Sequence, residues 1–264
     1  MASCLNNLAG LYDALAKYNK AKALYSQSLA IKMKILGNEH FDVVTILNNL
    51  ATIHYKLGEY EESEDFYLSI LANLEKSLDP NNPYIAKVLN NLAELYCTQK
   101  KYSEAEPMYL RSLHIREISL GEYHPDVATI LNNLALFYDS KDRYSEAETL
   151  YLRSLTIRTK VFGKDSLDVA VIQNNLAALC VNQGEFNKAE SLFLSSLKIR
   201  RNKLEITHPD IAVSLNNLLL LYITQGKYKV AIPIFKNYLM VIKKTLDKKQ
   251  HNSKMIKNNF QKLK

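Results

Sequence analysis

Apolar and polar residues follow one pattern that recurs along most of the chain. The stretch LNNLA occupies residues 5–9, 47–51, 89–93 and 131–135, and near copies occupy 173–177 and 215–219, so that each stretch begins 42 residues after the one before it. One more step reaches KNNFQ at 257–261, where the asparagine pair remains but the apolar frame is lost. The period predicts six repeats over residues 1–247 and a degenerate seventh-repeat helix over 248–264.

Within one repeat, apolar and small residues recur at helical spacing on two stripes. In the third repeat, these are Val88, Leu92, Leu95 and Tyr96, followed by Tyr102, Ala105, Tyr109 and Leu113. Glycine stands where each helix should stop, after the first helix at 58, 184 and 226 and after the second near 37, 121 and 163. Proline at 83, 125 and 209 fits the first turn of a helix. We therefore expect an all-α protein of about thirteen helices and no strand.

The net charge of +7 belongs to the end of the chain rather than to the repeats. Residues 243–264 contain eight lysines and one acidic residue, Asp247, which leaves the remainder neutral. Because phosphate binding requires a basic surface along the repeats, nucleic-acid or membrane binding is not expected of them. The tail is expected to be a basic C-terminal cap on the array; contact with RNA or anionic lipid is the alternative.

Reactive residues do not form a catalytic, metal or cofactor pattern. Cys4, Cys97 and Cys180 fall at unrelated points of the repeat, which predicts reduced thiols. The three loop histidines at 40, 124 and 208 belong to alternate repeats, too far apart for zinc ligation, and are expected to be structural. We expect no enzyme activity, cofactor or small-molecule substrate and, because no leader or membrane-spanning run is present, a cytoplasmic location.

The repeats resemble a known family. Leu–x–x–Leu–Ala–x–x–Tyr followed by Gly–x–Tyr–x–x–Ala resembles the tetratricopeptide (TPR) repeat. The period, the LNNLA helix, the Tyr-Ser-Glu-Ala-Glu segments at 102–106 and 144–148 and the Gly-x-x-His-Pro-Asp at 121–126 resemble the repeats of kinesin light chains and their bacterial relatives. The heptad coiled coil by which kinesin light chains join the motor is not found in these 264 residues, so the resemblance does not extend to motor attachment.

The resemblance implies a right-handed α-solenoid whose first helices line a concave groove. It places the second asparagine of each pair in that groove, at Asn7, Asn49, Asn91, Asn133, Asn175 and Asn217. A carboxamide can pair with both the N–H and the C=O of an extended peptide. The alternative is that the asparagines bond helix backbones or one another and fix the register of the repeats.

Other groove positions differ between the two ends of the array. In repeats two and three they are polar, namely Thr45, Thr52, Tyr55, Lys56, Lys87, Glu94 and Thr98. Further along they form an apolar strip of Leu136, Val171, Ala178, Val181, Val213, Leu220 and Ile223. Exposed apolar strips usually mark a partner site, although the C-terminal helix or a second copy of the chain could cover this one instead.

These observations predict a protein-interaction scaffold that binds an extended peptide or a partner helix in the groove. We expect micromolar affinity, about −8 kcal/mol, with apolar anchors and no requirement for a free terminal carboxylate. The alternative is a structural, oligomerising or sensor segment of a larger multidomain protein, with no peptide ligand of its own. The sequence leaves self-association open.

Overall fold

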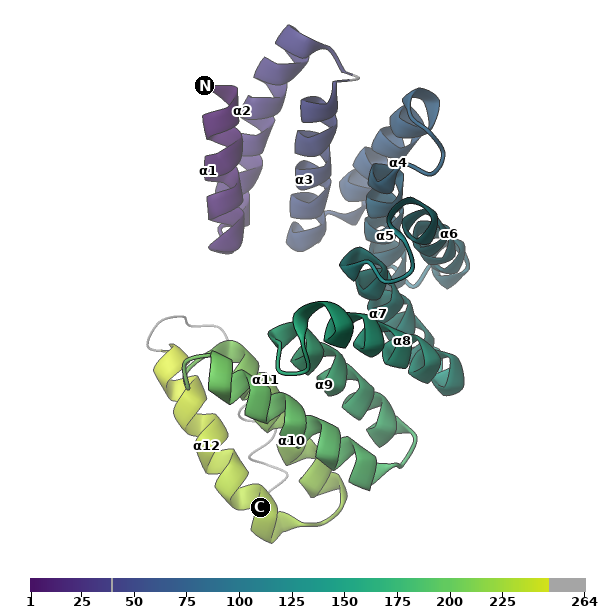
Figure 1. Ribbon diagram of the computed structural model, residues 1–264. Coiled ribbons are helices and arrows are strands. Elements are labelled where there is room, and N and C mark those ends of the chain that lie inside the picture. The colour runs from purple at the N-terminus through teal and green to yellow at the C-terminus, as the bar shows by residue number, and fades with distance from the viewer. Residues whose placement is uncertain (39, 247–264) are drawn as a thin grey trace. The chain divides into compact units, whose positions relative to one another are not determined.

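The repeat period is built from helices throughout the described part of the chain. The computed structural model describes residues 1–38 and 40–246, and these residues form twelve α-helices and no strand (Figure 1). The all-α prediction is confirmed. The predicted thirteenth helix, at 248–264, lies outside the described residues, and its capping role stays a prediction.

Each repeat contributes one first helix and one second helix. The first helices are α1 (Ala2–Ala14), α3 (Phe41–Leu57), α5 (Pro83–Thr98), α7 (Pro125–Asp139), α9 (Leu167–Asn182) and α11 (Pro209–Thr224). The second helices are α2 (Tyr18–Leu36), α4 (Tyr60–Ser77), α6 (Tyr102–Leu120), α8 (Tyr144–Phe162), α10 (Phe186–Lys203) and α12 (Tyr228–Leu246).

The chain divides into two compact units, residues 1–134 and 135–264, with the division inside α7. In unit 1, α1 to α6 pack in chain order, each helix against the next. In unit 2, α8 to α12 pack in the same way. Consecutive packing of short-looped helices is the arrangement of a helical repeat stack.

Alanine allows the two helices of a repeat to approach closely. The alanine that closes the LNNLA stretch is fully buried at Ala51, Ala93 and Ala177, and so is the second-helix alanine at Ala105 and Ala189. Alanine combines high helix propensity with a small side chain, so it suits a contact between helix axes. In repeat two the second-helix alanine is replaced by a buried serine at position 63, whose hydroxyl donates to the Ala51 carbonyl at 2.8 Å.

A second set of buried serines joins the two helices of repeats one, three and five, and sequence reasoning did not find them. Hydroxyls of the second helix donate to alanine carbonyls of the first helix, 26 residues earlier. The donor–acceptor pairs are Ser28 to Ala2 at 2.8 Å, Ser112 to Ala86 at 2.6 Å and Ser196 to Ala170 at 2.7 Å. Each satisfies a buried hydroxyl that would otherwise destabilise the core.

The turn between the two helices uses the left-handed backbone conformation in every repeat. Gly58 caps α3 with φ 80° and ψ 11°, as the sequence predicted. Lys100 and Asp142 hold the same place 42 residues apart and also have positive φ, 62° and 58°. The turn therefore keeps its geometry even where a side chain makes that geometry unfavourable.

Candidate functional site: the faces of the first helices

The two asparagines of each pair differ in exposure. In repeats two, five and six the first asparagine is buried, with Asn48, Asn174 and Asn216 only 7–8% exposed. The second asparagine in these repeats is half-buried. This ordering makes the second asparagine the one nearer the surface, in line with the preference drawn from the sequence.

The second asparagine also bonds to the preceding repeat. The Nδ2 group of Asn91 donates to Oδ1 of Asn48 at 3.3 Å, and Asn217 donates in the same way to Asn174 at 2.9 Å. The third such pair runs from Asn133 to the first asparagine of repeat three, at position 90, over 3.1 Å. Each bond contributes on the order of 1 kcal/mol and fixes the register of adjacent repeats. We call this series the asparagine ladder; it is the alternative that the sequence left open.

The ladder bond leaves part of the hydrogen-bonding capacity of the same asparagine side chain unused. A carboxamide has two N–H donors and an acceptor oxygen, and a ladder bond uses one donor. Asn217 also lines a hollow between α9 and α11, so its side chain both makes the ladder bond and borders this hollow. Peptide contact stays a prediction for the predicted groove asparagines, which are Asn49, Asn91, Asn133, Asn175 and Asn217.

The predicted apolar strip is exposed in unit 2. Four of its side chains have exposed fractions of 37–48%, namely Leu136, Val171, Val213 and Leu220. Ala178, Val181 and Leu220 line the hollow beside Asn217, which has a volume of about 150 Å³. Phe193 from α10 also lines this hollow, so it is bordered by aliphatic and aromatic carbon.

Two polar residues of the same hollow were not among the predicted positions. Asn182 and Thr224 end α9 and α11 and line its wall, and Nδ2 of Asn182 donates to Asp139 at 2.9 Å. Both share the repeat position of Thr98, which the sequence did place in the groove. Extending that position by the 42-residue period would have found them.

The corresponding face of unit 1 is polar, and many of its side chains bond to one another. The Thr52 and Tyr67 hydroxyls lie 2.9 Å apart, and the Tyr55 and Thr98 hydroxyls lie 3.0 Å apart. A predicted groove cation at position 56 is already paired, because its ammonium group donates to the Asp13 carboxylate at 2.7 Å.

Lys87 is the other predicted groove cation. Its exposed side chain lies beside a hollow of about 360 Å³, which Tyr84 and Arg116 also line. Arg116 is engaged with Asp126.

The loop histidines cap helices. Nδ1 of His40 and of His124 accepts a hydrogen bond from the backbone N–H two residues later, at 3.1 Å in both cases. His208 does the same at 3.2 Å at the start of α11. This satisfies one of the otherwise unpaired N–H groups of a helix N-terminus. Within residues 1–38 and 40–246, no three or more His, Cys, Asp and Glu residues cluster so as to hold a metal ion.

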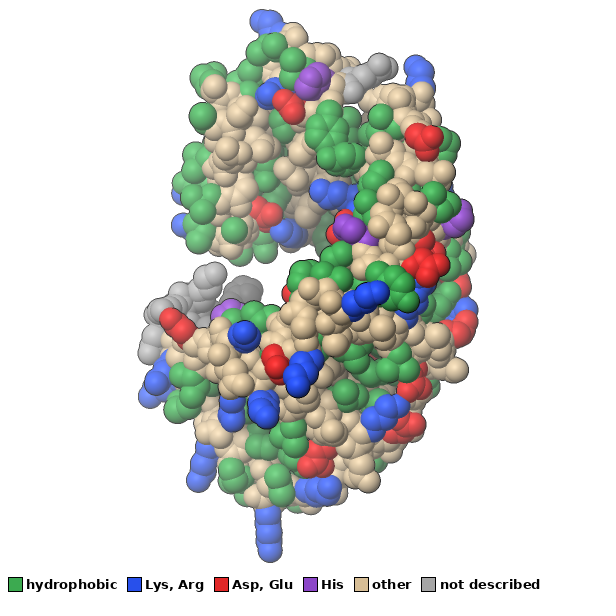
Figure 2. Space-filling model, in the orientation of Figure 1, with side chains coloured by type: hydrophobic (Ala, Val, Ile, Leu, Met, Phe, Trp, Pro, Cys, Tyr) green, Lys and Arg blue, Asp and Glu red, His purple; other side chains and the backbone are tan. Residues whose placement is uncertain are grey.

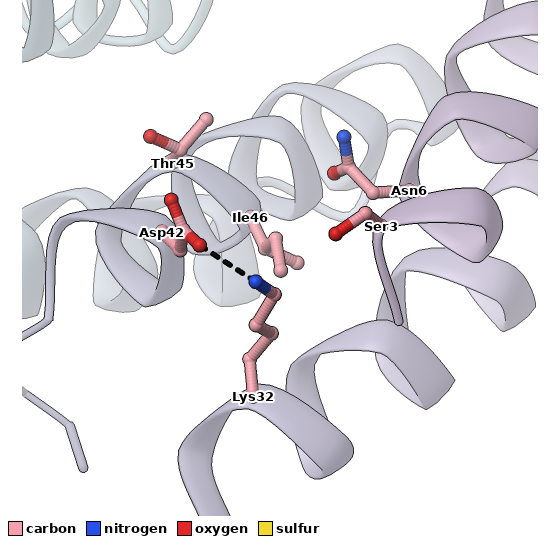
Figure 3. A pocket seen from close by; sticks show the side chains of 6 residues that line it. All are labelled: Ser3, Asn6, Lys32, Asp42, Thr45 and Ile46. Carbon is pink, nitrogen blue, oxygen red and sulfur yellow. Dashed lines mark hydrogen bonds and ion pairs between the residues drawn. The ribbon is translucent and has the colours of Figure 1, made fainter. Parts of the chain in front are cut away.

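A small hollow at the start of the chain is an inter-repeat contact. Figure 3 shows Lys32 reaching from α2 toward α3, where its ammonium group bonds Asp42 at 2.6 Å. Ser3 and Asn6 of α1 also line this hollow, whose volume is about 110 Å³. The same pairing recurs at the matching positions of later repeats, as Arg116 with Asp126 and as Arg158 with Asp168. The contact therefore belongs to the scaffold.

Charged side chains do not gather by sign on the visible face. In Figure 2 basic and acidic side chains lie among one another over the described residues of that face. Among the residues the structure covers, no helix is both long enough and apolar enough to cross a bilayer.

The comparisons with known proteins identify the family. The tetratricopeptide repeat profile matches residues 42–118, 84–160, 126–202 and 168–239, and a second tetratricopeptide repeat profile matches residues 1–42. The chain therefore belongs to the tetratricopeptide repeat family, whose members are generally protein-interaction scaffolds. A search of curated proteins gives no match.

Solved structures share the fold. BtubC (BKLC) from P. vanneervenii matches with a TM-score of 0.73 and 22% identity, over 86% of this chain and 92% of that one. A Podosopora anserina putative kinesin light chain with nearly identical TPR-like repeats matches with a TM-score of 0.63 and 22% identity, over 77% of this chain and 97% of that one. A second crystal structure of those repeats gives a TM-score of 0.64. The chain is thus similar in fold to kinesin-light-chain-like repeat structures.

Proposed function

We propose that this protein binds an extended peptide or a partner helix against the faces of its first helices. The observation that carries the proposal is the apolar strip of unit 2. Leu136, Val171, Val213 and Leu220 stand exposed along first helices, the elements that line the ligand groove in this family's fold. Covering exposed aliphatic carbon releases about 25 cal/mol per Å² of buried area, so a ligand gains affinity there.

In this proposal, one side chain of the ligand binds in the hollow between α9 and α11. Ala178, Val181 and Leu220 offer apolar contact to an aliphatic or aromatic ligand side chain. Asn217 and Asn182 on its wall each use one amide N–H in a bond within the scaffold and keep the other for a ligand backbone. Backbone bonds supply affinity that does not depend on sequence, and the anchor side chain supplies specificity. We expect micromolar binding, about −8 kcal/mol.

The polar face of unit 1 argues against recognition of a terminal carboxylate. A carboxylate clamp needs several unpaired cations on adjacent repeats, whereas Lys56 is held by Asp13. The ligand should therefore bind equally well as a free acid and as a C-terminal amide.

The test is selection of peptides from a random decapeptide library on the immobilised chain, followed by titration of selected peptides in solution. Leu220→Asp should weaken binding at least tenfold, because it places a charge in the apolar hollow. Asn175→Ala should weaken binding by a few fold, in line with the loss of one hydrogen bond. Leu194→Asp is the matched control: Leu194 is 46% exposed in the same unit, but on the second helix α10.

Two outcomes would contradict the proposal. If Leu194→Asp and Leu220→Asp weakened binding equally, the ligand would not lie on the first helices. If no peptide were selected and the chain formed dimers or larger species, a structural segment that associates with its own copies would explain the exposed strip better. Sedimentation velocity of wild type and Leu220→Asp separates these cases.

A further inference from the structure

One charged side chain on the first-helix face of unit 1 has no counterpart in the other five repeats. Glu94 lies on α5, and the same repeat position is occupied by residues without charge, namely Gly10, Thr52, Leu136, Ala178 and Leu220. The repeat fold therefore does not require an acid at this position. Its presence in one repeat needs a local explanation.

The surroundings of Glu94 make its charge unfavourable in the isolated protein. The side chain is exposed, yet the protein around it removes enough water to raise the pKa of its carboxyl group. Three phenols and one thiol share this environment; burial raises the pKa of each, and the charge of Glu94 adds to the rise. They are Tyr55, Tyr67, Tyr109 and Cys97.

No cation among residues 1–38 and 40–246 compensates that charge through an ion pair. Two lysines of unit 1 are already engaged: Lys56 pairs with Asp13 at 2.7 Å and Lys101 pairs with an acid of α4 at 2.8 Å. Lys87 is on the same helix as Glu94, but seven residues away, which is about 10 Å along the helix axis.

The neighbours of Glu94 suit the stem of a long basic side chain. Tyr55 reaches from α3 to bond Thr98, one turn after Glu94 on α5, and its ring remains half-buried. An aromatic ring next to a carboxylate can hold the aliphatic part or the charged end of lysine or arginine. Lysine or arginine would also restore the charge balance that the protein lacks there.

We propose that Glu94 receives a lysine or arginine side chain of the bound peptide and so selects ligands that carry a basic residue at that point. This inference rests on the proposed peptide-binding function and specifies one position of the ligand. It assigns to the first-helix face of unit 1 a selection by charge, which is tested independently of the apolar anchoring proposed for unit 2. The bond would be a charge-assisted hydrogen bond in a partly dehydrated setting, which is stronger than one between neutral groups.

The experiment repeats the decapeptide selection on wild type and on Glu94→Gln, which keeps the shape of the side chain and removes its charge. Wild type should select peptides enriched in lysine or arginine at one position, and Glu94→Gln should lose that enrichment while it still selects peptides with apolar anchors. Glu122→Gln is the matched control, since Glu122 is an exposed acid in the loop before α7. It should enrich the same basic position as wild type.

Titration of one selected peptide gives the size of the effect. Glu94→Gln should weaken its binding about tenfold, in the range for a hydrogen bond to a charged group. A peptide with glutamine in place of the basic residue should bind wild type and Glu94→Gln equally. Because ionised Glu94 is the binding form, wild-type affinity should fall as the pH drops through its raised pKa, and Glu94→Gln should lack that step.

The outcomes separate this inference from the proposed function. Selected peptides with apolar anchors but no basic preference would overturn the role of Glu94 and leave the peptide-binding proposal standing. An equal loss in Glu122→Gln would show a general effect of net charge and would also overturn it. Failure of both proteins to select any peptide would overturn both proposals.

Discussion

The two units use one scaffold and differ in what they display on it. Asn91 bonds to Asn48 in unit 1, and Asn217 bonds to Asn174 in unit 2 through the same atoms. The residue three places after each of these second asparagines differs, being glutamate at position 94 in unit 1 and leucine at position 220 in unit 2. The comparison teaches that the 42-residue period specifies the packing, whereas the exposed faces of the two units differ at positions that depart from the period.

The difference has an energetic consequence. In unit 1 many face residues are already hydrogen-bonded to one another, as Thr52 is to Tyr67, so a ligand must exchange existing bonds for new ones. In unit 2 the exposed side chains of Leu136 and Val213 are aliphatic, so a ligand that covers them breaks no hydrogen bond of these side chains. We therefore expect a peptide to bind the exposed carbon of unit 2 more tightly than the hydrogen-bonded face of unit 1.

The largest predicted effect is a loss of stability on truncation of a core leucine. It tests whether the two units are packed alike. Leu50 and Leu176 share one repeat position, each is 2% exposed, and they lie in different units. Either leucine replaced by alanine should destabilise its unit by about 2–5 kcal/mol, because a buried cavity is left behind. The measurement is chemical denaturation followed by circular dichroism. A loss confined to one of the two variants would show that the units are not packed alike.

The next effect concerns the asparagine ladder. Asn48→Ala and Asn174→Ala each remove the acceptor of a partly buried inter-repeat bond, one in each unit. We expect a loss of about 1–3 kcal/mol for each, because the donor amide is left without its partner. Asn81→Ala is a control, since Asn81 is an exposed asparagine in the loop before α5. Unchanged stability in both ladder variants would mean that the ladder bonds make no net contribution to folding.

The sequence predicted local structure correctly at positions where few residue types are compatible with the backbone conformation. Glycine at 58 and proline at 83 marked the ends and starts of helices because few other residues suit those places. The repeat favoured the second asparagine of each pair for the groove, which stays a prediction; in repeats two, five and six that asparagine is the more exposed of the two. It could not say what that asparagine bonds to, since a ladder and a ligand-binding amide use the same side chain. The separations of 2.9–3.3 Å between asparagines of adjacent repeats decided that the ladder exists.

Residue type alone did not predict features in which the backbone conformation recurs from repeat to repeat but the residue changes. Lys100 and Asp142 adopt the left-handed conformation that glycine provides elsewhere; lysine rarely does so and aspartate only occasionally, and it is their place one period from Gly58 and Gly184 that indicates it. Buried serines such as Ser112 were missed for a related reason: serine is usually exposed, and its burial depends on a carbonyl supplied by another helix.

Substitutions at the left-handed positions should change the free energy of unfolding by smaller amounts. The sign should depend on whether glycine is introduced or removed. Lys100→Gly in unit 1 and Asp142→Gly in unit 2 should each stabilise the protein by up to about 1 kcal/mol, because glycine relieves the strain of positive φ. Gly58→Ala and Gly184→Ala, at the same repeat position, should destabilise it by a similar amount. Denaturation midpoints give the sign directly. Destabilisation by both glycine substitutions would mean that the native side chains hold these turns.

The smallest expected effect is a difference in acid sensitivity between the units. His54 in α3 is 7% exposed, and burial, followed by the nearby Lys22, lowers its pKa below the usual 6.5. The same repeat position in unit 2 carries Tyr138, Cys180 and Tyr222, which do not gain charge between pH 5 and 7. Because the folded state binds a proton at His54 less readily than the unfolded state, stability is full above about pH 6.5 and falls as the pH drops through the lowered pKa.

His54→Tyr should therefore flatten this part of the stability profile, measured by denaturant midpoints from pH 7.5 to 5. His114→Tyr, a change at an exposed histidine of α6, is the control and should keep the wild-type slope. An unchanged slope in His54→Tyr would assign the acid sensitivity of unit 1 to its carboxylates instead, because these are the remaining groups that take up protons toward pH 5.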